Sequence, residues 1–232
     1  MAQQIPLPFA RFDHLDFDLY VPGQNRQAVE YLRRIATGEE TKNSYLWGEP
    51  ATGKSHLLQA VCEDVVRRKK STAYIPLSEH QDFQIEMLQG LEQLDLVCMD
   101  DLDTIAGKEN WEQAVFHLFN RLHEQGKPLI ISAKSSPKGI MIRLPDLKSR
   151  LEWGVTWHLQ TLTDQQQSQV LQQRARARGF ELPPEVADYL LKRIPRDMQT
   201  LLKLLDELDI ATLVEQKKLT IPFVKTLLTP QA

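Results

Sequence analysis

Residues 48–55, which read Gly-Glu-Pro-Ala-Thr-Gly-Lys-Ser, have the types and spacing of a phosphate-binding loop. They satisfy the pattern G-x-x-x-x-G-K-[ST] in full, and a predicted strand precedes them while a predicted helix follows. Lys54 is expected to reach the β-phosphate and any γ-phosphate, and Ser55 to ligate Mg²⁺. A glycine-rich turn arising by chance is the alternative, which the flanking elements disfavour. The residues expected to contact the nucleotide here are Gly48, Pro50, Ala51, Thr52, Gly53, Lys54, Ser55 and His56.

A second group of polar residues follows the almost wholly apolar run 94–99. Such a run is typical of a central parallel strand covered on both faces. At its end, Asp100 is expected to hold Mg²⁺ directly or through water, and Asp101 to orient an attacking water. An acidic turn is the alternative, because acids commonly begin loops. Ser132, at the end of the next predicted strand, is a candidate sensor of the γ-phosphate; the alternative is a loop hydrogen bond, which is the more common role of a serine at a strand end.

The composition is that of a globular chain with room for one large domain and a small satellite. It has 232 residues, 42% hydrophobic and 25% charged. A net charge of −3 argues against a general electrostatic grip on DNA. No apolar run approaches the roughly 18 to 20 residues of a membrane span, and no signal peptide is evident. Cys62 and Cys98 fall in a predicted helix and a predicted buried strand, which indicates reduced thiols in a cytoplasmic protein.

Strands alternate with helices up to about residue 160. This predicts an α/β fold, a parallel sheet flanked by helices and carrying the phosphate loop. The predicted strands are 43–47, 72–77, 94–99, 128–133 and 156–159, and the predicted helices are 24–36, 54–68, one within 83–90, and 111–125.

After residue 163 the periodicity is helical throughout, punctuated by glycine and proline. Helices are predicted over 164–178, 184–194, 197–216 and 221–228. The expected domains are an extended N-terminal arm over 1–20, an α/β nucleotide-binding domain over 21–162, and a small all-helical lid over 163–232.

From about Phe12 onward the chain resembles the AAA+ domain of the DnaA family of replication initiators. The resemblance is carried by residues 53–60 (GKSHLLQA), by Asp100-Asp101 with residues 106–109 (AGKE), and by 147–154 (LKSRLEWG). Within that family it is most similar to the regulatory paralogues that inactivate the initiator. Segments 144–147, 178–183 and 219–225 favour this branch, as does an expected end of the chain after the lid, without a DNA-binding helix-turn-helix domain.

The resemblance gives Arg150 a role in a neighbouring molecule's active site. In this family the matching arginine crosses a subunit boundary and stabilises charge on the γ-phosphate, an effect of roughly 10³–10⁵ in rate where it has been dissected. A surface arginine or one in an intramolecular salt bridge is the alternative. The resemblance also implies that backbone near Tyr20 and Val21 forms part of the nucleotide pocket.

One departure from the family concerns the lid arginine that senses nucleotide, because its position falls on Gln199. Glutamine donates a hydrogen bond but supplies neither charge nor a bidentate clamp. Arg196 lies three residues earlier, near the same helix face, and is a candidate substitute. Efficient intrinsic ATP turnover is therefore not expected. The expected cofactors are a nucleoside diphosphate, ADP, with Mg²⁺; ATP is the alternative.

The N-terminal arm is similar to short peptides that dock on the DNA polymerase sliding clamp, its β subunit. Prolines hold such an arm extended, so that apolar side chains fill a pocket while a glutamine amide anchors the end. An arm tucked against its own core is the alternative. The expected clamp-binding residues are Gln4, Ile5, Leu7, Pro8 and Phe9.

The resemblance thus implies a negative regulator of replication initiation. It would bind the DNA-loaded clamp, contact DNA only through it, and present Arg150 to the AAA+ domain of DnaA to stimulate ATP hydrolysis. The expected location is cytoplasmic and nucleoid-associated, with no membrane partner. The alternative is a self-sufficient AAA+ motor such as a helicase loader, which would use Asp101 for its own turnover and Arg150 within a homo-oligomeric ring. A nucleotide kinase is disfavoured because no second basic cluster is evident; base preference and oligomeric state stay open.

Overall fold

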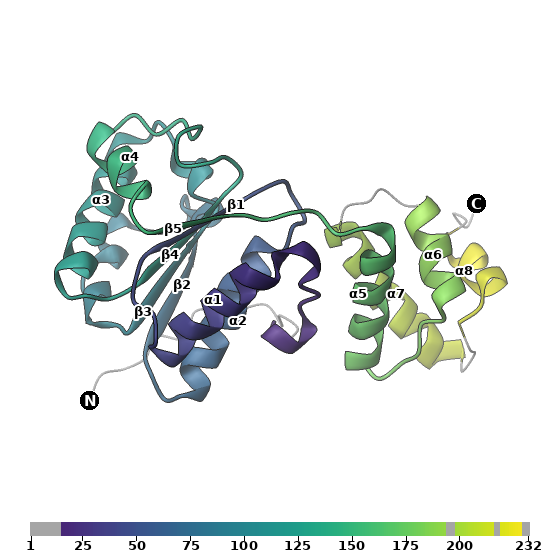
Figure 1. Ribbon diagram of the computed structural model, residues 1–232. Helices are drawn as coiled ribbons and strands as arrows, with labels where there is room; N and C mark the ends of the chain where they lie inside the picture. The colour runs from purple at the N-terminus through teal and green to yellow at the C-terminus, as the bar shows by residue number, and fades with distance from the viewer. Residues whose placement is uncertain (1–14, 194–197, 216–218, 229–232) are drawn as a thin grey trace.

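The computed structural model describes residues 15–193, 198–215 and 219–228. Figure 1 shows two units, an α/β unit and a helical unit, joined by an extended segment that leaves the last strand. A phosphate-binding loop at the end of a strand in the α/β unit can therefore lie next to the helical unit.

The sheet of the first unit has five parallel strands in the order β2-β3-β4-β1-β5. Parallel strands end at the same edge of a sheet, and this edge is where ligands bind in open α/β folds. Because β4 lies between β1 and β3, the end of β4 separates the phosphate loop from the acids that follow β3. The strands are β1 Ser44–Trp47, β2 Thr72–Pro76, β3 Leu96–Asp100, β4 Leu129–Ala133 and β5 Val155–His158.

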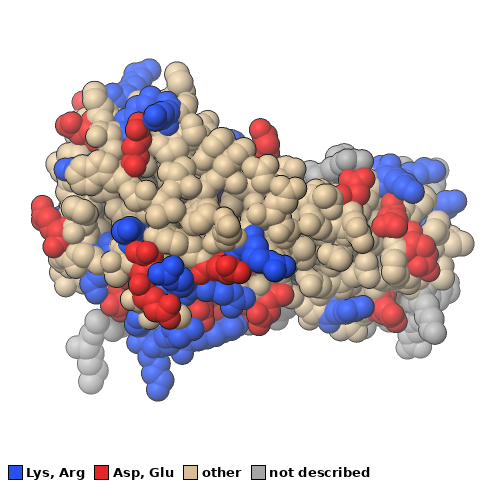
Figure 2. All heavy atoms as spheres, in the orientation of Figure 1, with Lys and Arg blue, Asp and Glu red and all other residues tan. Residues whose placement is uncertain are grey.

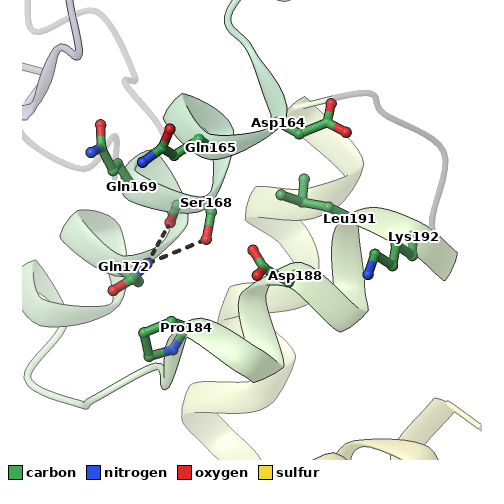
Figure 3. A pocket seen from close by; sticks show the side chains of 9 residues that line it. All are labelled: Asp164, Gln165, Ser168, Gln169, Gln172, Pro184, Asp188, Leu191 and Lys192. Carbon is green, nitrogen blue, oxygen red and sulfur yellow. Dashed lines mark hydrogen bonds between the residues drawn. The ribbon is translucent and has the colours of Figure 1, made fainter.

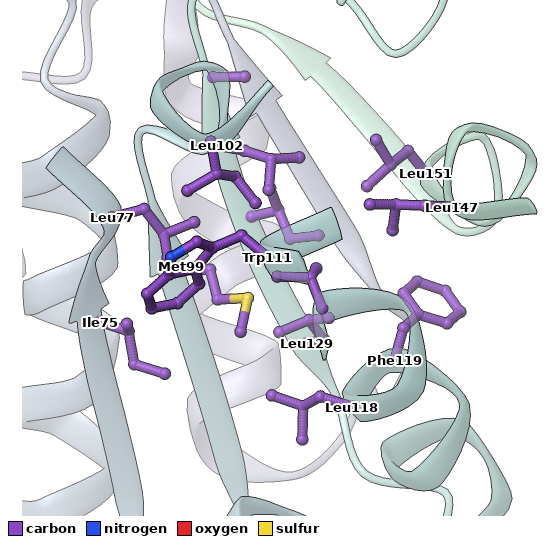
Figure 4. Close-up of a cluster of buried hydrophobic side chains, with 14 of the residues drawn as sticks. Ile75, Leu77, Met99, Leu102, Trp111, Leu118, Phe119, Leu129, Leu147 and Leu151 are labelled. Carbon is purple, nitrogen blue, oxygen red and sulfur yellow. The ribbon is translucent and has the colours of Figure 1, made fainter. Parts of the chain in front are cut away.

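Helices cover both faces of this sheet. Helices α1 (Arg26–Thr37) and α2 (Lys54–Arg67) share one apolar cluster with Leu96 and Cys98 of β3. Helices α3 (Glu109–Glu124) and α4 (Pro145–Leu151) share another with alternate residues of the same strand, among them Met99, as the close-up in Figure 4 shows. A strand buried on both faces needs apolar side chains on both, which explains the apolar residues 96–99 of β3.

The second unit is a bundle with its own apolar core. It consists of α5 Asp164–Ala177, α6 Pro184–Arg193, α7 Met198–Glu215 and α8 Ile221–Leu228. Helix α5 begins with a capping box, in which the Thr163 hydroxyl accepts the Gln166 N–H and the Gln166 side chain accepts the Thr163 N–H. The core of the bundle includes Leu171, Leu190, Leu205, Leu208 and Val224. Among the residues described, none of the helices is long and apolar enough to cross a bilayer.

The N-terminal segment differs from the extended arm expected over residues 1–20. From Leu15 onward it packs on the α/β unit, with a 3-10 turn at Phe17–Leu19. Phe17 and Tyr20 are buried in the cluster that α1 and α2 form, and the Arg33 guanidinium lies 4.5 Å from the centre of the Phe17 ring. Two large aromatic side chains thus hold this segment on the core, and the clamp-binding peptide lies outside the described residues.

Two local elements also differ from expectation. The helix expected within 83–90 is a 3-10 turn, Ile85–Leu88, whose last residue, Leu88, is buried. Helix α4 was not expected, because seven residues are too few to show a helical repeat. Its apolar contacts come from Leu147 and Leu151, one turn apart, which point toward Phe119 of α3 in Figure 4.

Candidate nucleotide site

The phosphate loop connects β1 to α2, and both of its glycine positions leave no room for a side chain. Gly53 has φ +84, and a Cβ there would lie 2.6 Å from the Tyr20 ring. A Cβ on Gly48 would lie 2.5 Å from the Leu159 carbonyl oxygen. Within the described part of the chain, the backbone N–H groups from Ala51 to His56 donate to no other protein group. Unused donors at the start of a helix form an anion site.

Lys54 is folded back onto the loop. Its Nζ donates to the carbonyl oxygens of Gly48 at 2.8 Å and Glu49 at 3.0 Å. Burial lowers the pKa of Lys54, while the charge of nearby Asp101 partly opposes this shift. An ammonium bound to neutral carbonyls forms stronger, charge-assisted bonds when an anion replaces them.

The acids after β3 occupy two different environments. Asp100 is buried, and its carboxylate accepts one hydrogen bond from the Ser132 hydroxyl and one of 2.6 Å from the Tyr74 hydroxyl. The Ser132 hydroxyl in turn accepts the Asp101 N–H at 3.0 Å. Asp101 has φ +57 and lines the cavity described below. Burial, and next the charge of Asp100, raise the pKa of Asp101.

These groups fit a magnesium ion that arrives with a nucleotide. Mg²⁺ in such sites is held by one or two carboxylates, several waters and the substrate phosphates. Ser55 and Asp101 line the cavity, whereas both oxygens of Asp100 already accept hydroxyl groups, so Asp100 fits a water-mediated contact better than direct ligation. In the described part of the chain, no cluster of three or more histidine, cysteine or acidic side chains would hold a metal ion by itself.

A cavity of about 590 Å³ lies over this edge of the sheet, within the range of small-molecule sites. It brings together these predicted residues: Tyr20, Val21, Pro50, Ala51, Thr52, Gly53, Lys54, Ser55, His56 and Asp101. Gly48, Asp100 and Ser132 are not among the residues that line it. Arg196 lies outside the described residues, and Gln199 lies in the first turn of α7 with its side chain not described.

The lid contributes to this cavity through an arginine that the sequence reading did not single out. Arg174 of α5 lines it, and its Nη2 lies 3.2 Å from the Nδ1 of His56. Burial lowers the pKa of His56 to about 4, so the imidazole is neutral near pH 7. Arginines stand at 174, 176 and 178, and nothing in their spacing marks which one faces the core.

Lys134 is a second cavity residue that was missed. It follows β4 directly, two residues after Ser132, and its backbone N–H donates to the carboxylate of Asp103 at 2.5 Å. Its position in the sequence could have identified Lys134 as a site residue, because the first residues after a buried parallel strand lie at the ligand-binding edge of the sheet.

A hollow of about 560 Å³ on the lid, between α5 and α6, has a different character (Figure 3). Amide side chains and the carboxylates of Asp164 and Asp188 line it, and Gln172 Nε2 donates to the Ser168 carbonyl and hydroxyl oxygens at 3.3 Å. The two carboxylates repel phosphate and outnumber the one lysine in the lining, Lys192, so this hollow suits a nucleotide less well than the cavity over the sheet.

Arg150 lies on α4, away from this cavity. In Figure 1, α4 stands at the end of the α/β unit opposite the lid. The guanidinium stacks 3.8 Å from the centre of the Trp153 ring, and Trp153 is 44% exposed. Arg150 is partly exposed, and among the described residues no ion pair involves it. The alternative of an arginine confined to an intramolecular salt bridge therefore has no support here.

A buried carboxylate holds the segment that leads into α4. Glu112 of α3 is 1% exposed and accepts the backbone N–H groups of Gly107 at 2.6 Å, Arg143 at 3.0 Å and Leu144 at 2.7 Å. It thereby ties the loop that follows the Asp100–Asp101 pair to the segment that leads into the helix of Arg150.

Glu112→Gln is expected to destabilise the chain by about 2–3 kcal/mol, because an amide nitrogen would face backbone donors and leave them unsatisfied. Urea unfolding measures this loss. The matched control is Glu109→Gln on the exposed start of the same helix, expected within about 0.5 kcal/mol of the parent. An unchanged urea midpoint for Glu112→Gln would contradict the assignment.

Comparison with known proteins agrees with this geometry. The family model of the bacterial DnaA ATPase domain matches residues 13–158, and that of the Hda lid domain matches residues 164–228. Domain III of the replication initiation protein DnaA from Thermotoga maritima is similar in structure with a TM-score of 0.80 at 21% identity, over 96% of this chain and 98% of that chain.

Two further structures resemble the chain in fold. AMPPCP-bound DnaA from Aquifex aeolicus has a TM-score of 0.68 at 24% identity, over 84% of this chain and 66% of that chain. The RuvB Holliday junction branch migration motor of Thermotoga maritima has a TM-score of 0.68 at 14% identity, over 91% and 70%. Both carry an AAA+ fold, as the α/β prediction with a helical lid requires. With more than half of its residues matched by one family model, the chain belongs to the bacterial DnaA ATPase family, as an Hda-like paralogue of DnaA.

Proposed function

We propose that this chain binds a nucleoside diphosphate with Mg²⁺ and acts on DnaA as a regulator of replication initiation. Docked on the DNA-loaded sliding clamp, it presents Arg150 to ATP-bound DnaA and accelerates hydrolysis there. The observation that carries this proposal is the separation of two sites. A complete phosphate loop faces the lid, while Arg150 lies partly exposed at the opposite end of the α/β unit.

Nucleotide binding is supported by the unused loop donors, by the cation of Lys54 and by the cavity around them. The relative from Aquifex aeolicus is a DnaA bound to AMPPCP, a nucleotide analogue. Gln199 supplies no charge to the lid side, which favours ADP over ATP as the resident nucleotide. Calorimetric titration measures this preference, and much tighter binding of ATP than of ADP would contradict it.

The catalytic contribution is assigned to Arg150 in trans. Its stacking on Trp153 holds the guanidinium at the surface while leaving its N–H donors free to bind a phosphate oxygen. Asp101 lines the chain's own cavity and is the group that would orient water if the chain hydrolyses ATP slowly itself. The bound nucleotide would then act mainly by setting the position of the lid relative to the α/β unit.

The clamp peptide, Gln4, Ile5, Leu7, Pro8 and Phe9, lies outside the described residues and is proposed from its sequence alone. DNA is proposed to be met only through the clamp. On the face shown in Figure 2, acidic and basic side chains intermix. Arginines on α1 and α2 are also paired with acids, as in Arg33 of α1 with Asp18 at 3.5 Å and Arg67 of α2 with Asp16 at 3.4 Å.

The test is reconstitution with purified components. The chain is added to ATP-bound DnaA with or without a clamp loaded on DNA, and release of phosphate is followed. Faster hydrolysis by DnaA is expected only when the clamp is loaded, and peptide 3–10 added in excess should suppress it. No acceleration with loaded clamp would refute the regulatory role.

The competing function is a self-sufficient AAA+ motor, favoured by one observation, that Asp101 lines the phosphate cavity. A motor would hydrolyse ATP steadily without DnaA and form rings with ATP on a sizing column. These two measurements on the isolated chain separate the functions.

A further inference from the structure

In the part of the chain that the structure describes, a hydrogen bond joins the lid to the helix that follows the phosphate loop. Arg174 of α5 is only 3% exposed, and its Nη2 lies 3.2 Å from the Nδ1 of His56 on α2. Arginine has no acceptor, so His56 Nδ1 accepts this bond, and Nε2 carries the hydrogen that it donates to the Asp16 carbonyl at 2.7 Å. His56 therefore joins the lid to the N-terminal segment.

His56 is also fixed to the loop that surrounds the phosphate site. It stands directly after Ser55 in the first turn of α2. Its ring meets the Tyr20 ring edge-on at 5.3 Å, and the Tyr20 hydroxyl donates to the Thr52 carbonyl at 3.2 Å. The imidazole that Arg174 contacts is thereby packed against a side chain that is hydrogen-bonded to the loop.

Arg174 faces the ligand side of this contact as well. It lines the same cavity as Lys54 and Ser55, although it comes from the other unit. A guanidinium beside backbone donors that have no protein acceptor suits an anion, because its planar donors bind phosphate oxygens in pairs.

Resting on the nucleotide binding proposed above, we infer that Arg174, held in place by His56, is the residue through which the lid senses a nucleoside diphosphate. The diphosphate, seated on the loop donors, orders the first turn of α2 and with it His56. It also gives Arg174 an anionic neighbour, so the lid is held against the core. Gln199 is not required for this response.

The experiment titrates ADP into the full chain by calorimetry and follows amide hydrogen exchange in α5. Arg174→Gln should bind ADP about 10- to 100-fold more weakly, as expected for losing a charge-assisted contact. ADP should also no longer slow exchange in α5. Arg176→Gln, an exposed position on the same helix, is the matched control and should behave as the parent.

A second pair of variants keeps the test decisive if Arg174→Gln does not fold. His56→Gln retains one acceptor and one donor and should keep most of the ADP affinity, whereas His56→Leu should lose it as Arg174→Gln does. ADP affinity equal to the parent's in both Arg174→Gln and His56→Leu overturns the inference, even if thermal stability falls. Failure of the unmodified chain to bind ADP would instead refute the proposed nucleotide function itself.

Discussion

Replacing Arg150 by alanine is expected to remove the stimulation of DnaA while leaving the chain folded and able to bind nucleotide. A finger arginine contributes roughly 10³–10⁵ in rate, or about 4–7 kcal/mol of transition-state stabilisation. The folded state loses little, because the guanidinium contacts the partly exposed Trp153 ring and such a contact is worth about 0.5–1 kcal/mol. The loss should therefore appear in the clamp-dependent ATPase assay and not in the unfolding curve.

The matched control for this variant is Lys148→Ala on the same short helix. It removes a cation from α4 without removing the bidentate donor, so it should retain most of the stimulation. Arg150→Lys separates charge from geometry, since an ammonium supplies the charge but not the planar pair of donors. Full stimulation by Arg150→Ala would remove the finger assignment, whatever the other variants do.

The α/β fold and its helical lid were predictable because the signals are long or locally complete. Residues 96–99 are apolar at every position, as a strand buried on both faces requires. The phosphate loop is specified within eight residues by glycines, a lysine and a serine, so no tertiary information is needed to recognise it. Helix α1 is likewise bounded by its own sequence, ending at Gly38 with φ +88.

What the sequence did not reveal depends on contacts between distant segments. Arg174 is separated from His56 by more than a hundred residues, and its neighbours Arg176 and Arg178 look the same in sequence. The burial of Asp100 behind two hydroxyls depends on Tyr74 from a different strand. The packing of Phe17 and Tyr20 against α1 and α2 follows from the space that these helices leave, not from any local pattern.

Replacing Lys54 by alanine should weaken ADP binding about 100-fold, because one charge-assisted contact to phosphate is worth about 1.5–3 kcal/mol. In the described part of the chain the Nζ donates to the Gly48 and Glu49 carbonyls, neutral acceptors of the loop itself, so the fold should persist without it. The readouts are calorimetry and the thermal stabilisation by ADP. At one hundred times the parent dissociation constant, ADP stabilises the parent by about 2.7 kcal/mol, and nearly all of this should vanish in the variant.

Lys54→Ala also tests whether the bound nucleotide acts by positioning the lid or by taking part in catalysis. If bound ADP sets the position of the lid, Lys54→Ala should lose stimulation of DnaA at low ADP and regain it at ADP concentrations that refill the site. Arg150→Ala should not recover at any ADP concentration, because its defect lies in the partner's active site. Lys138→Ala, an exposed lysine in the loop after β4, is the control and should match the parent throughout. Undiminished stimulation by Lys54→Ala without added ADP would mean that the phosphate site is not coupled to the finger.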